Sequence, residues 1–340
     1  MLISAIIPAF NAGRFINRTI DSILTQTYRD YEIIVVDDGS TDDTADIVKN
    51  YGDKVTYIYQ DNSGDGAARN TGIAAAKGDW TAFLDHDDEW LPKKLFMQME
   101  VLQRNPTLRW CGSNRYQSDG KRCFPVGNVK AIKKALVNGD YFASFFEAMT
   151  KGVCPVITST MLIRREVFEQ VGVFDPSLVR CADLDLWWRI AYRYPEIGYI
   201  AELMATVHLN VENIVSTKHR LASKRGPLPD GLIAKHLKLA DKQGALEDFK
   251  PYAKKRLRKK LVIAIYHGRK DDVRQAVEYF REYFPWHWRT GAYLLTIFPE
   301  VTSTIAKTIA YLAYKLRLDK QVTRRWLYSK KAGKSNSSNT

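Results

Sequence analysis

Short apolar runs alternate with helical patterns through the first 110 residues of this chain. Residues 2–8 and 80–84 are short apolar runs, and residues 32–36 (EIIVV) have the composition of a strand buried on both faces. Over residues 12–26, apolar side chains recur at spacings of three and four, which is typical of an amphipathic helix. Strands that alternate with helices of about 10–15 residues form βαβ units. The sequence therefore predicts an α/β fold with a mostly parallel central sheet.

Two of the predicted strands end in acidic clusters, Asp37-Asp38 after the second and Asp85-His86-Asp87-Asp88 after the fourth. Ligands of an open α/β sheet bind at the carboxyl ends of its strands, so these side chains should meet at one edge. Five carboxylates repel one another unless a cation neutralises them, and hard oxygen ligands favour Mg²⁺ or Mn²⁺. Asp, Asn, Gly and Ser are also ordinary loop residues, which is the alternative explanation. The presence of both clusters at the same edge favours a cation-dependent site.

A dinucleotide-binding Rossmann domain is the main rival for this pattern. Asp37 follows the second strand, where such a domain carries a ribose-binding acid. That fold also requires a G-x-G-x-x-G turn after the first strand. Residues 8–15 read PAFNAGRF and contain a single glycine, Gly13. Because the phosphate-binding turn is missing, we set the Rossmann oxidoreductase aside.

Four segments, taken together, resemble the family 2 glycosyltransferases. They are IIPAFN, VVDDGSTDDT, GAARNTGIAAAKGDW and FLDHDDEW, which lie in this order within residues 3–95. A fainter match continues through VFDPSL, CADLDLWWRI and VHLNVENIVS to about residue 217. The resemblance implies the GT-A fold and an inverting enzyme that uses a nucleotide-diphospho-sugar. It also implies a bacterial enzyme of polysaccharide or lipopolysaccharide biosynthesis, with a saccharide or lipid-linked saccharide as acceptor and, we expect, a UDP-sugar as donor.

The resemblance assigns a role to each residue that matches a family motif. Pro8, Phe10 and Asn11 would line the pocket for the nucleotide base, and Asp38 would accept a hydrogen bond from the base. Arg69 would lie near the nucleotide and its pyrophosphate.

The same resemblance assigns the metal site. Asp85 and Asp87 match the two acids of the family's D-x-D motif, so Asp85 would lie near the ribose and Asp87 would ligate a Mg²⁺ or Mn²⁺ ion. His208 stands where many relatives have a histidine that ligates the metal or contacts phosphate. A histidine near the end of a strand can equally be a polar group with a structural partner.

The family carries its general base in a Glu-Asp pair before a helix that reads x-D-L-W-x-R. Asp183 matches the aspartate of this pair, whereas Ala182 replaces the glutamate. Asp185 is the alternative base, although an acid in the first turn of a helix is also explained by the helix dipole. The chemistry requires a base, because the acceptor hydroxyl loses a proton as it attacks. It also requires a positive charge near the leaving diphosphate, which a divalent cation supplies.

The basic charge of the chain is confined to its C-terminal third. The formal net charge is +13, but residues 1–215 carry a net charge of −5 and residues 216–340 a net charge of +18. We therefore expect a catalytic domain at residues 1–217, a linker at residues 218–232 and a helical basic region at residues 233–333. Residues 334–340 should form a disordered tail.

The basic region is expected to lie on an anionic membrane. Apolar residues recur at helical spacing over residues 301–318, and aromatic and basic residues flank them, as in interfacial helices. Packing of this stripe on the catalytic domain is the alternative. Motifs typical of nucleic-acid-binding proteins are missing, so we expect no nucleic acid partner. The N-terminus lacks the pattern of a signal peptide. The resemblance implies work on lipid-linked saccharides at the cytoplasmic face, so we expect a cytoplasmic enzyme, peripheral on the inner face of the plasma membrane.

A metal-dependent glycosyltransferase is the hypothesis that these observations favour. One alternative is a sugar nucleotidyltransferase, which would be favoured by a glycine-rich, lysine-bearing loop after the first strand. The other is a non-catalytic protein that binds membranes or nucleic acid, which the loss of the acidic residues would favour. The sequence lacks such a loop and retains Asp38, Asp85, Asp87 and Asp183.

Overall fold

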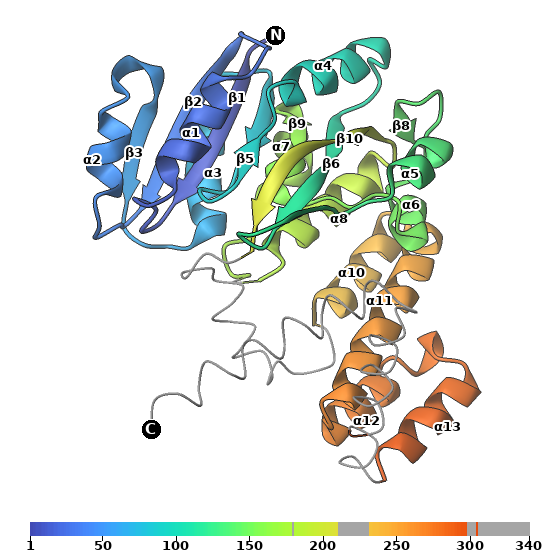
Figure 1. Cartoon of the computed structure of the whole chain (residues 1–340). Coiled ribbons are helices and arrows are strands. Elements are labelled where there is room, and N and C mark those ends of the chain that lie inside the picture. The colour runs from blue at the N-terminus through green and yellow to red at the C-terminus, as the bar shows by residue number, and fades with distance from the viewer. Residues whose placement is uncertain (179, 210–230, 298–303, 305–340) are drawn as a thin grey trace, which may run out of the picture. The chain divides into compact units, whose positions relative to one another are not determined.

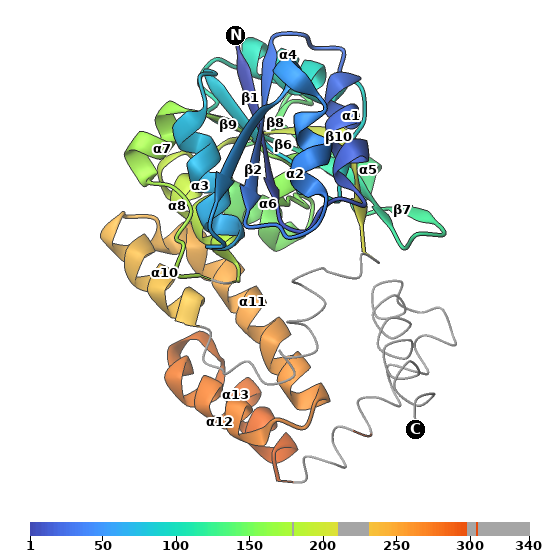
Figure 2. The ribbon, with the colours of Figure 1, turned by 90° about the vertical axis from the view of Figure 1, so that its left-hand side faces the viewer.

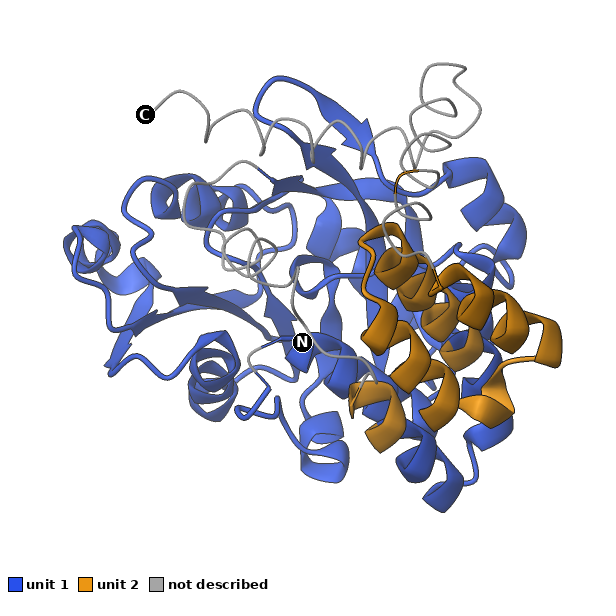
Figure 3. Cartoon of the chain, turned by 90° about the horizontal axis from the view of Figure 1, so that it is seen from below, with its two compact units in different colours: residues 1–218, 236–252 blue, residues 219–235, 253–340 orange. Residues whose placement is uncertain are grey.

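A computed structural model describes residues 1–178, 180–209, 231–297 and 304, as Figure 1 shows. The chain divides into two compact units, drawn in different colours in Figure 3. The described residues of the first unit are those up to 209 together with 236–252, and those of the second are 231–235 and residues from 253 onward. The linker expected at 218–232, the apolar stripe at 301–318 and the tail at 334–340 lie largely or wholly outside the described residues.

The first unit is built around a curled sheet with the strand order β3-β2-β1-β4-β9-β6-β10-β5. The first four strands in this order are parallel, as the sequence predicts. Strand β9 is antiparallel to both of its neighbours, β6 and β10 pair in parallel, and β5 is antiparallel to β10. The strands are β1 (Ile3–Ala9), β2 (Tyr31–Asp38), β3 (Thr56–Gln60), β4 (Trp80–Phe83), β5 (Glu89–Trp90), β6 (Trp110–Ser118), β9 (Leu162–Arg164) and β10 (Ile197–His208). Two short strands, β7 (Cys123–Pro125) and β8 (Tyr141–Phe142), pair with β6 and β10.

Helices cover both faces of the sheet. Alternate residues of β2 point to opposite faces, so Ile33 and Val35 pack with α1 and α4, whereas Ile34 and Val36 pack with α3. Figure 2 shows α1 and α3 on opposite sides of β2. The helices of this unit are α1 (Ile16–Leu24), α2 (Thr44–Lys49), α3 (Asp65–Ala75), α4 (Lys94–Arg104), α5 (Val129–Ala135), α6 (Phe145–Lys151), α7 (Glu166–Val171) and α8 (Ala182–Arg193). Parts of α10 (Gly231–Lys242) and α11 (Leu246–Tyr266) complete it.

The long strand β10 is irregular in its pairing. Its pairing with β6 shifts register between Ile200 and Leu203 and again between Leu203 and Thr206. Such bulges interrupt the alternation of buried and exposed residues without ending the strand, so the sequence pattern reads as two pieces. The strand carries His208 to the carboxyl edge of the sheet.

The first residue of α4, Lys94, is a buried lysine. Nζ of Lys94 donates a hydrogen bond to Oε1 of Gln98 over 2.8 Å and lies 4.0 Å from the centroid of the Trp90 ring. The residue has no exposed surface. Burial lowers the pKa of Lys94 to about 7, because the charged form loses its water of hydration.

Replacing Lys94 with methionine should remove a pH dependence of stability. The pKa of lysine in an unfolded chain is about 10.4, so between pH 7 and that value the unfolded protein binds more protons than the folded one. Stability therefore rises with pH in this range. Between pH 7 and pH 9, the wild type should gain about 2 kcal/mol in free energy of unfolding relative to Lys94→Met, as measured by urea denaturation. Parallel pH profiles of the two proteins would show that Lys94 is not buried as described.

The described part of the second unit is helical. It contains the end of α11, then α12 (Lys270–Tyr279) and α13 (Trp286–Leu295). The guanidinium carbon of Arg258 lies 5.1 Å from the centroid of the Trp288 ring, which joins α11 to α13. None of the helices within the described residues has both the length and the apolar run that crossing a bilayer requires.

Candidate active site

The carboxyl ends of β1 and β2 are joined by the Asn11 side chain. The backbone of Asn11 has a φ of 49°, a left-handed conformation that asparagine tolerates better than most residues. Its side-chain Oδ1 accepts a hydrogen bond from the backbone N–H of Thr41 over 2.9 Å, and its backbone N–H donates to Oγ of Ser40 over 2.9 Å. Pro8 lies within β1, whereas Phe10 next to Asn11 is 39% exposed. This geometry leaves an aromatic face open at the strand edge.

Asp38 organises the segment that leads from β3 into α3. Its carboxylate accepts hydrogen bonds from the Gln60 side chain over 2.7 Å and from the amides of Ser63 and Gly64 over 2.9 and 2.8 Å. The residue is buried. A carboxylate has about four acceptor sites, so one remains beyond these three bonds. The predicted hydrogen bond from a nucleotide base to Asp38 therefore stays a prediction that the geometry allows.

Arg69 is a buried cation among carboxylates. Its Nη2 lies 2.7 Å from Oδ1 of Asp85 and 3.8 Å from Oδ2 of Asp65. Burial opposes the charged form, but Asp85, Asp65 and Asp183 outweigh it and raise the pKa of Arg69. Its Nε is buried and has no hydrogen-bond partner among the described residues. The guanidinium therefore keeps a donor for a further acceptor.

The turn after β4 concentrates negative charge. Burial raises the pKa of Asp87, and Asp85 raises it further, whereas His86 and His208 act in the opposite direction. Burial and the charges of Asp85 and Asp87 raise the pKa of Asp88 well above its usual value. A nearby cation would stabilise the charged form of carboxyl groups whose pKa is raised in this way.

Asp88 is a structural brace that the sequence reasoning left without a role. Its Oδ2 accepts a 2.5 Å hydrogen bond from the Ser159 hydroxyl, and its Oδ1 accepts one from the His208 amide over 3.2 Å. Ser159, in the 3₁₀-helix Thr158–Thr160, also accepts a hydrogen bond from the Asp85 amide over 3.2 Å. The position of Asp88 beside Asp87 was the only signal in the sequence, and nothing there pointed to Ser159.

His208 is held by a carboxylate. Its Nε2 lies 2.7 Å from Oε1 of Glu89, which is also 3.1 Å from Nε of Arg18. Histidine ligands of metals commonly donate their other ring N–H to a carboxylate in this way. Glu89, which the sequence reasoning did not single out, is therefore the residue that sets the orientation of the imidazole.

Arg69 and Asp183 line the same cavity of about 300 Å³. One wall is the start of α3, and another is the start of α8 with Cys181, which has a φ of 64°. Asp38 and Asp85 are not among the lining residues. Asp38 binds the amides of Ser63 and Gly64, which line the cavity, and Asp85 is ion-paired with Arg69. The cavity is lined by Ser63, Gly64, Asp65, Gly66, Arg69, Thr158, Pro176, Leu178, Cys181, Ala182 and Asp183.

Asp185 occupies a different environment from Asp183. It has no exposed surface, and its carboxylate binds Arg189 over 2.8 Å and Nε2 of His236 over 3.0 Å. These partners hold Asp185 in the interior of the unit rather than in the cavity. The geometry thus favours Asp183 over Asp185 as the general base.

The side chains of the described residues alone do not form a closed metal site. Within the described residues, no three His, Cys, Asp or Glu side chains converge as a metal-binding group. Mg²⁺ commonly binds one or two carboxylates and takes its other ligands from substrate phosphates and water. The carboxylates of the turn after β4 fit an ion of this open kind.

Comparison with known proteins identifies the family of this chain. Residues 4–172 match the model of the family described as glycosyl transferase family 2. An uncharacterized glycosyltransferase of Rickettsia prowazekii is 31% identical over 237 residues, which cover 69% of this chain and 72% of that protein. The chain belongs to glycosyltransferase family 2.

Further matches agree with the assignment of this chain to glycosyltransferase family 2. A Bacillus subtilis protein assigned to teichuronic acid biosynthesis, glycosyltransferase TuaG, is 30% identical over 66% of this chain and 85% of its own length. Staphylococcus aureus TarS 1–349, solved with UDP-GlcNAc, matches with a TM-score of 0.64 and 14% identity, covering 93% of this chain and 92% of that one. A Pyrobaculum calidifontis mannosyltransferase, solved with GDP-Man and Mn²⁺, matches with a TM-score of 0.58 and 18% identity. The match covers 95% of this chain and 82% of that one. The structural matches show the GT-A fold.

Proposed function

We propose that this protein transfers a sugar from a nucleotide-diphospho-sugar to a hydroxyl group of a saccharide or lipid-linked saccharide in cell-surface polysaccharide synthesis. The observation that carries the proposal is the shared cavity of Arg69 and Asp183. It brings a buried cation with an unused donor next to a carboxylate. The relatives TuaG and TarS support the substrate class, since one is assigned to teichuronic acid synthesis and the other was solved with UDP-GlcNAc.

The donor would bind along the carboxyl edge of the sheet. Phe10 and Asn11 would face the base, with Pro8 behind them, and Asp38 would accept a hydrogen bond from it. The guanidinium of Arg69, which lines the cavity, would donate to an oxygen of the diphosphate, next to the amides at the start of α3. Asp85, which is ion-paired with Arg69, would face the ribose.

A divalent cation, Mg²⁺ or Mn²⁺, would neutralise the charge that develops on the diphosphate. Asp87 would hold it, together with Nδ1 of His208, whose Nε2 is engaged by Glu89. The proposal is supported by the raised pKa of Asp87 and by the Mn²⁺ bound in the Pyrobaculum enzyme.

The transfer would be a single displacement. The acceptor oxygen bonds to the anomeric carbon while the bond from that carbon to the diphosphate oxygen breaks, and the electron pair leaves with the nucleoside diphosphate. Asp183 takes the proton of the acceptor hydroxyl as the new bond forms. Attack from the face opposite the leaving group inverts the configuration at the anomeric carbon.

Nucleotide binding tests this proposal without knowledge of the acceptor. The protein would be titrated by calorimetry with UDP, GDP, CDP and dTDP, each with and without Mn²⁺. We expect one nucleoside diphosphate to bind in the micromolar range in the presence of Mn²⁺. The absence of binding across the whole panel would refute the proposed function.

The second unit would hold the enzyme on an anionic membrane at the inner face of the plasma membrane. Its α13 and the residues just after it expose large apolar side chains within twelve positions, and α11 carries the densest run of basic residues in the chain. Exposed aromatic and aliphatic side chains beside basic residues are typical of interfacial helices. The exposed residues are Trp286, Tyr293, Leu294, Leu295 and Ile297.

The double variant Trp286→Ser/Leu294→Ser should bind vesicles of phosphatidylserine and phosphatidylcholine more weakly. Losing the burial of two large apolar side chains should lower the partition coefficient about tenfold or more, as measured by vesicle sedimentation. Phe96→Ser, which removes an exposed aromatic residue from the first unit, should bind like the wild type. If the double variant binds as tightly as the wild type, α13 does not contact the membrane.

A further inference from the structure

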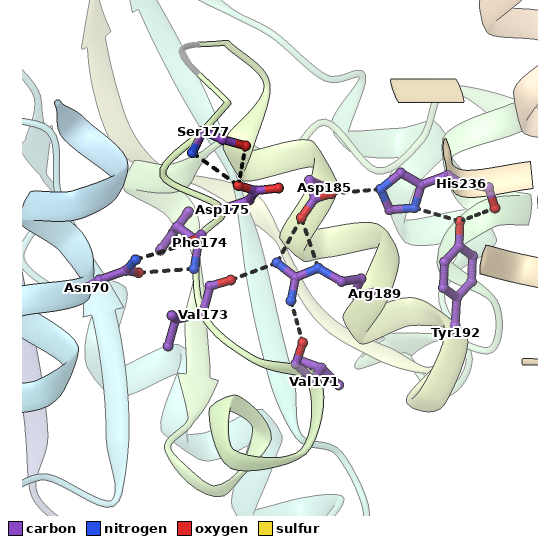
Figure 4. A network of polar contacts seen from close by, with 10 residues as sticks. All are labelled: Asn70, Val171, Val173, Phe174, Asp175, Ser177, Asp185, Arg189, Tyr192 and His236. Atoms are coloured by element: carbon purple, nitrogen blue, oxygen red, sulfur yellow. Dashed lines mark hydrogen bonds and ion pairs between the residues drawn. The ribbon is translucent and has the colours of Figure 1, made fainter. Parts of the chain in front are cut away.

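A loop between α7 and α8 joins the two sides of the cavity. Residues 172–178, which we call the 172–178 loop, contribute Pro176 and Leu178 to the cavity wall. Figure 4 shows that side chains from α3 and from α8 bind this loop at its beginning. It therefore lies next to both residues that the proposed function uses, Arg69 and Asp183.

On the α3 side, Asn70 binds both backbone groups of one loop residue. Its Nδ2 donates to the Phe174 carbonyl over 2.9 Å, and its Oδ1 accepts from the Phe174 amide over 3.0 Å. The Phe174 ring is buried, with its centroid 5.3 Å from that of Phe83 and 6.0 Å from that of Trp187. A reciprocal pair of hydrogen bonds fixes both the distance and the orientation of the Phe174 backbone relative to α3. Asn70 therefore determines the position of the first part of the loop.

On the α8 side, Arg189 binds the backbone just before Phe174. Its Nη2 donates to the Val173 carbonyl over 2.7 Å, and its Nη1 donates to the Val171 carbonyl. Asp185 binds the guanidinium and is itself bound to His236, and neither residue has exposed surface. The buried Asp185 thus fixes the position of the Arg189 guanidinium, and the hydrogen bonds of Arg189 fix the backbone at the start of the loop.

Phe174 also contacts Arg69, the residue that would bind the diphosphate of the sugar donor. The guanidinium carbon of Arg69 lies 5.5 Å from the centroid of the Phe174 ring. Asn70 is the next residue along α3, so Arg69 and the loop are held by neighbouring positions of one helix. A shift of the loop would change the width of the cavity between Arg69 and Asp183.

We propose that Asn70 is a positioning residue of the transfer reaction: its bonds to Phe174 hold the 172–178 loop where the acceptor hydroxyl meets the donor and Asp183. This inference rests on the proposed function. Asn70 itself would touch neither substrate. A misplacement of about 1 Å in a reacting group can cost about 100-fold in rate, which sets the size of the expected effect.

Asn70→Ala tests the role of this residue through two independent measurements. In hydrogen exchange, the Phe174 amide, which loses its acceptor, should exchange about ten- to a hundredfold faster. The other amides of residues 173–178 (Pro176 has none) should exchange faster with it, while β1 amides keep their protection. In assays with the nucleotide sugar that the wild type uses, kcat should fall about tenfold to 100-fold. The Kd for the nucleotide with Mn²⁺ and the KM for the donor should stay within about threefold, because Arg69 and Asp87 remain.

Two further variants separate positioning from a general loss of stability. Asn128→Ala removes another asparagine side chain that binds a backbone amide, that of Ala131 at the start of α5, and should change neither the exchange of the loop nor kcat. Arg189→Lys loosens the same loop from α8, because a lysine cannot reproduce the fork of hydrogen bonds, and should lower kcat with unchanged nucleotide affinity.

Three outcomes would overturn this inference. They are unchanged exchange of residues 173–178 in Asn70→Ala, faster exchange with full kcat, or a loss of nucleotide affinity as large as the loss of kcat. If the wild type turns over no donor at all, the proposed function has failed, and the role of Asn70 in the reaction fails with it. The exchange data still decide separately whether Asn70 holds the loop.

Discussion

Asp183→Asn should abolish sugar transfer and leave nucleotide binding intact. Asparagine has the shape of aspartate but cannot take a proton from the acceptor hydroxyl at neutral pH. General base catalysis contributes about 10²–10⁴-fold in rate, so kcat should fall by that factor. The Kd for the nucleoside diphosphate with Mn²⁺ should stay within about twofold, since Asp183 contributes to the acceptor side of the cavity.

Asp65→Asn is the matched control for this variant. Asp65 also lines the cavity and lies 3.8 Å from Arg69, but its side chain is more than half exposed. It should keep kcat within about tenfold of the wild type, because a solvated carboxylate contributes little to the field at the reacting atoms. Full activity in Asp183→Asn, or an equal loss in both variants, would show that Asp183 is not the base.

Asp87→Ala should abolish the effect of Mn²⁺ on nucleotide binding. In the wild type, Mn²⁺ should strengthen binding of the nucleoside diphosphate, and EDTA should reverse this. Loss of a metal-binding carboxylate should weaken binding about 100-fold or more, to the affinity measured without metal. Titration calorimetry with and without Mn²⁺ measures both values directly.

The control for Asp87→Ala is Asp241→Ala, which removes an exposed carboxylate from α10. It should bind Mn²⁺ and nucleotide like the wild type. His208→Ala should give an intermediate loss if His208 is a ligand, and Glu89→Gln a smaller one through the orientation of the imidazole. Retention of Mn²⁺-dependent binding in Asp87→Ala would remove Asp87 from the metal site.

The order of strands and helices and the strand-end positions of the acidic residues could be predicted, because both are local properties. A run such as residues 32–36 determines its own strand, and the carboxyl ends of parallel strands meet at one edge of the sheet. The contacts that brace the site could not be predicted in this way. Ser159 binds Asp88 across 71 positions of sequence, and no local pattern reports such a contact.

The environment of α8 shows the same limit. Helical spacing left open whether Asp183 or Asp185 faces the substrate. Trp187 and Trp188 of the same helix are fully buried, and Trp188 packs with His236 and Phe249. These partners come from residues 236–252, which the sequence assigned to the basic region. The structure groups them with the first unit.

Turnover of a nucleotide sugar tests the central claim most directly. The protein would be incubated with Mn²⁺, anionic vesicles and a panel of UDP-, GDP- and dTDP-sugars. Release of the nucleoside diphosphate, with water accepting the sugar in place of the saccharide, would be followed over time. We predict that at least one donor is cleaved, and that both EDTA and Asp183→Asn reduce the rate about 100-fold or more. The account would be contradicted by a panel in which no donor is cleaved, or by release that proceeds equally well in Asp183→Asn.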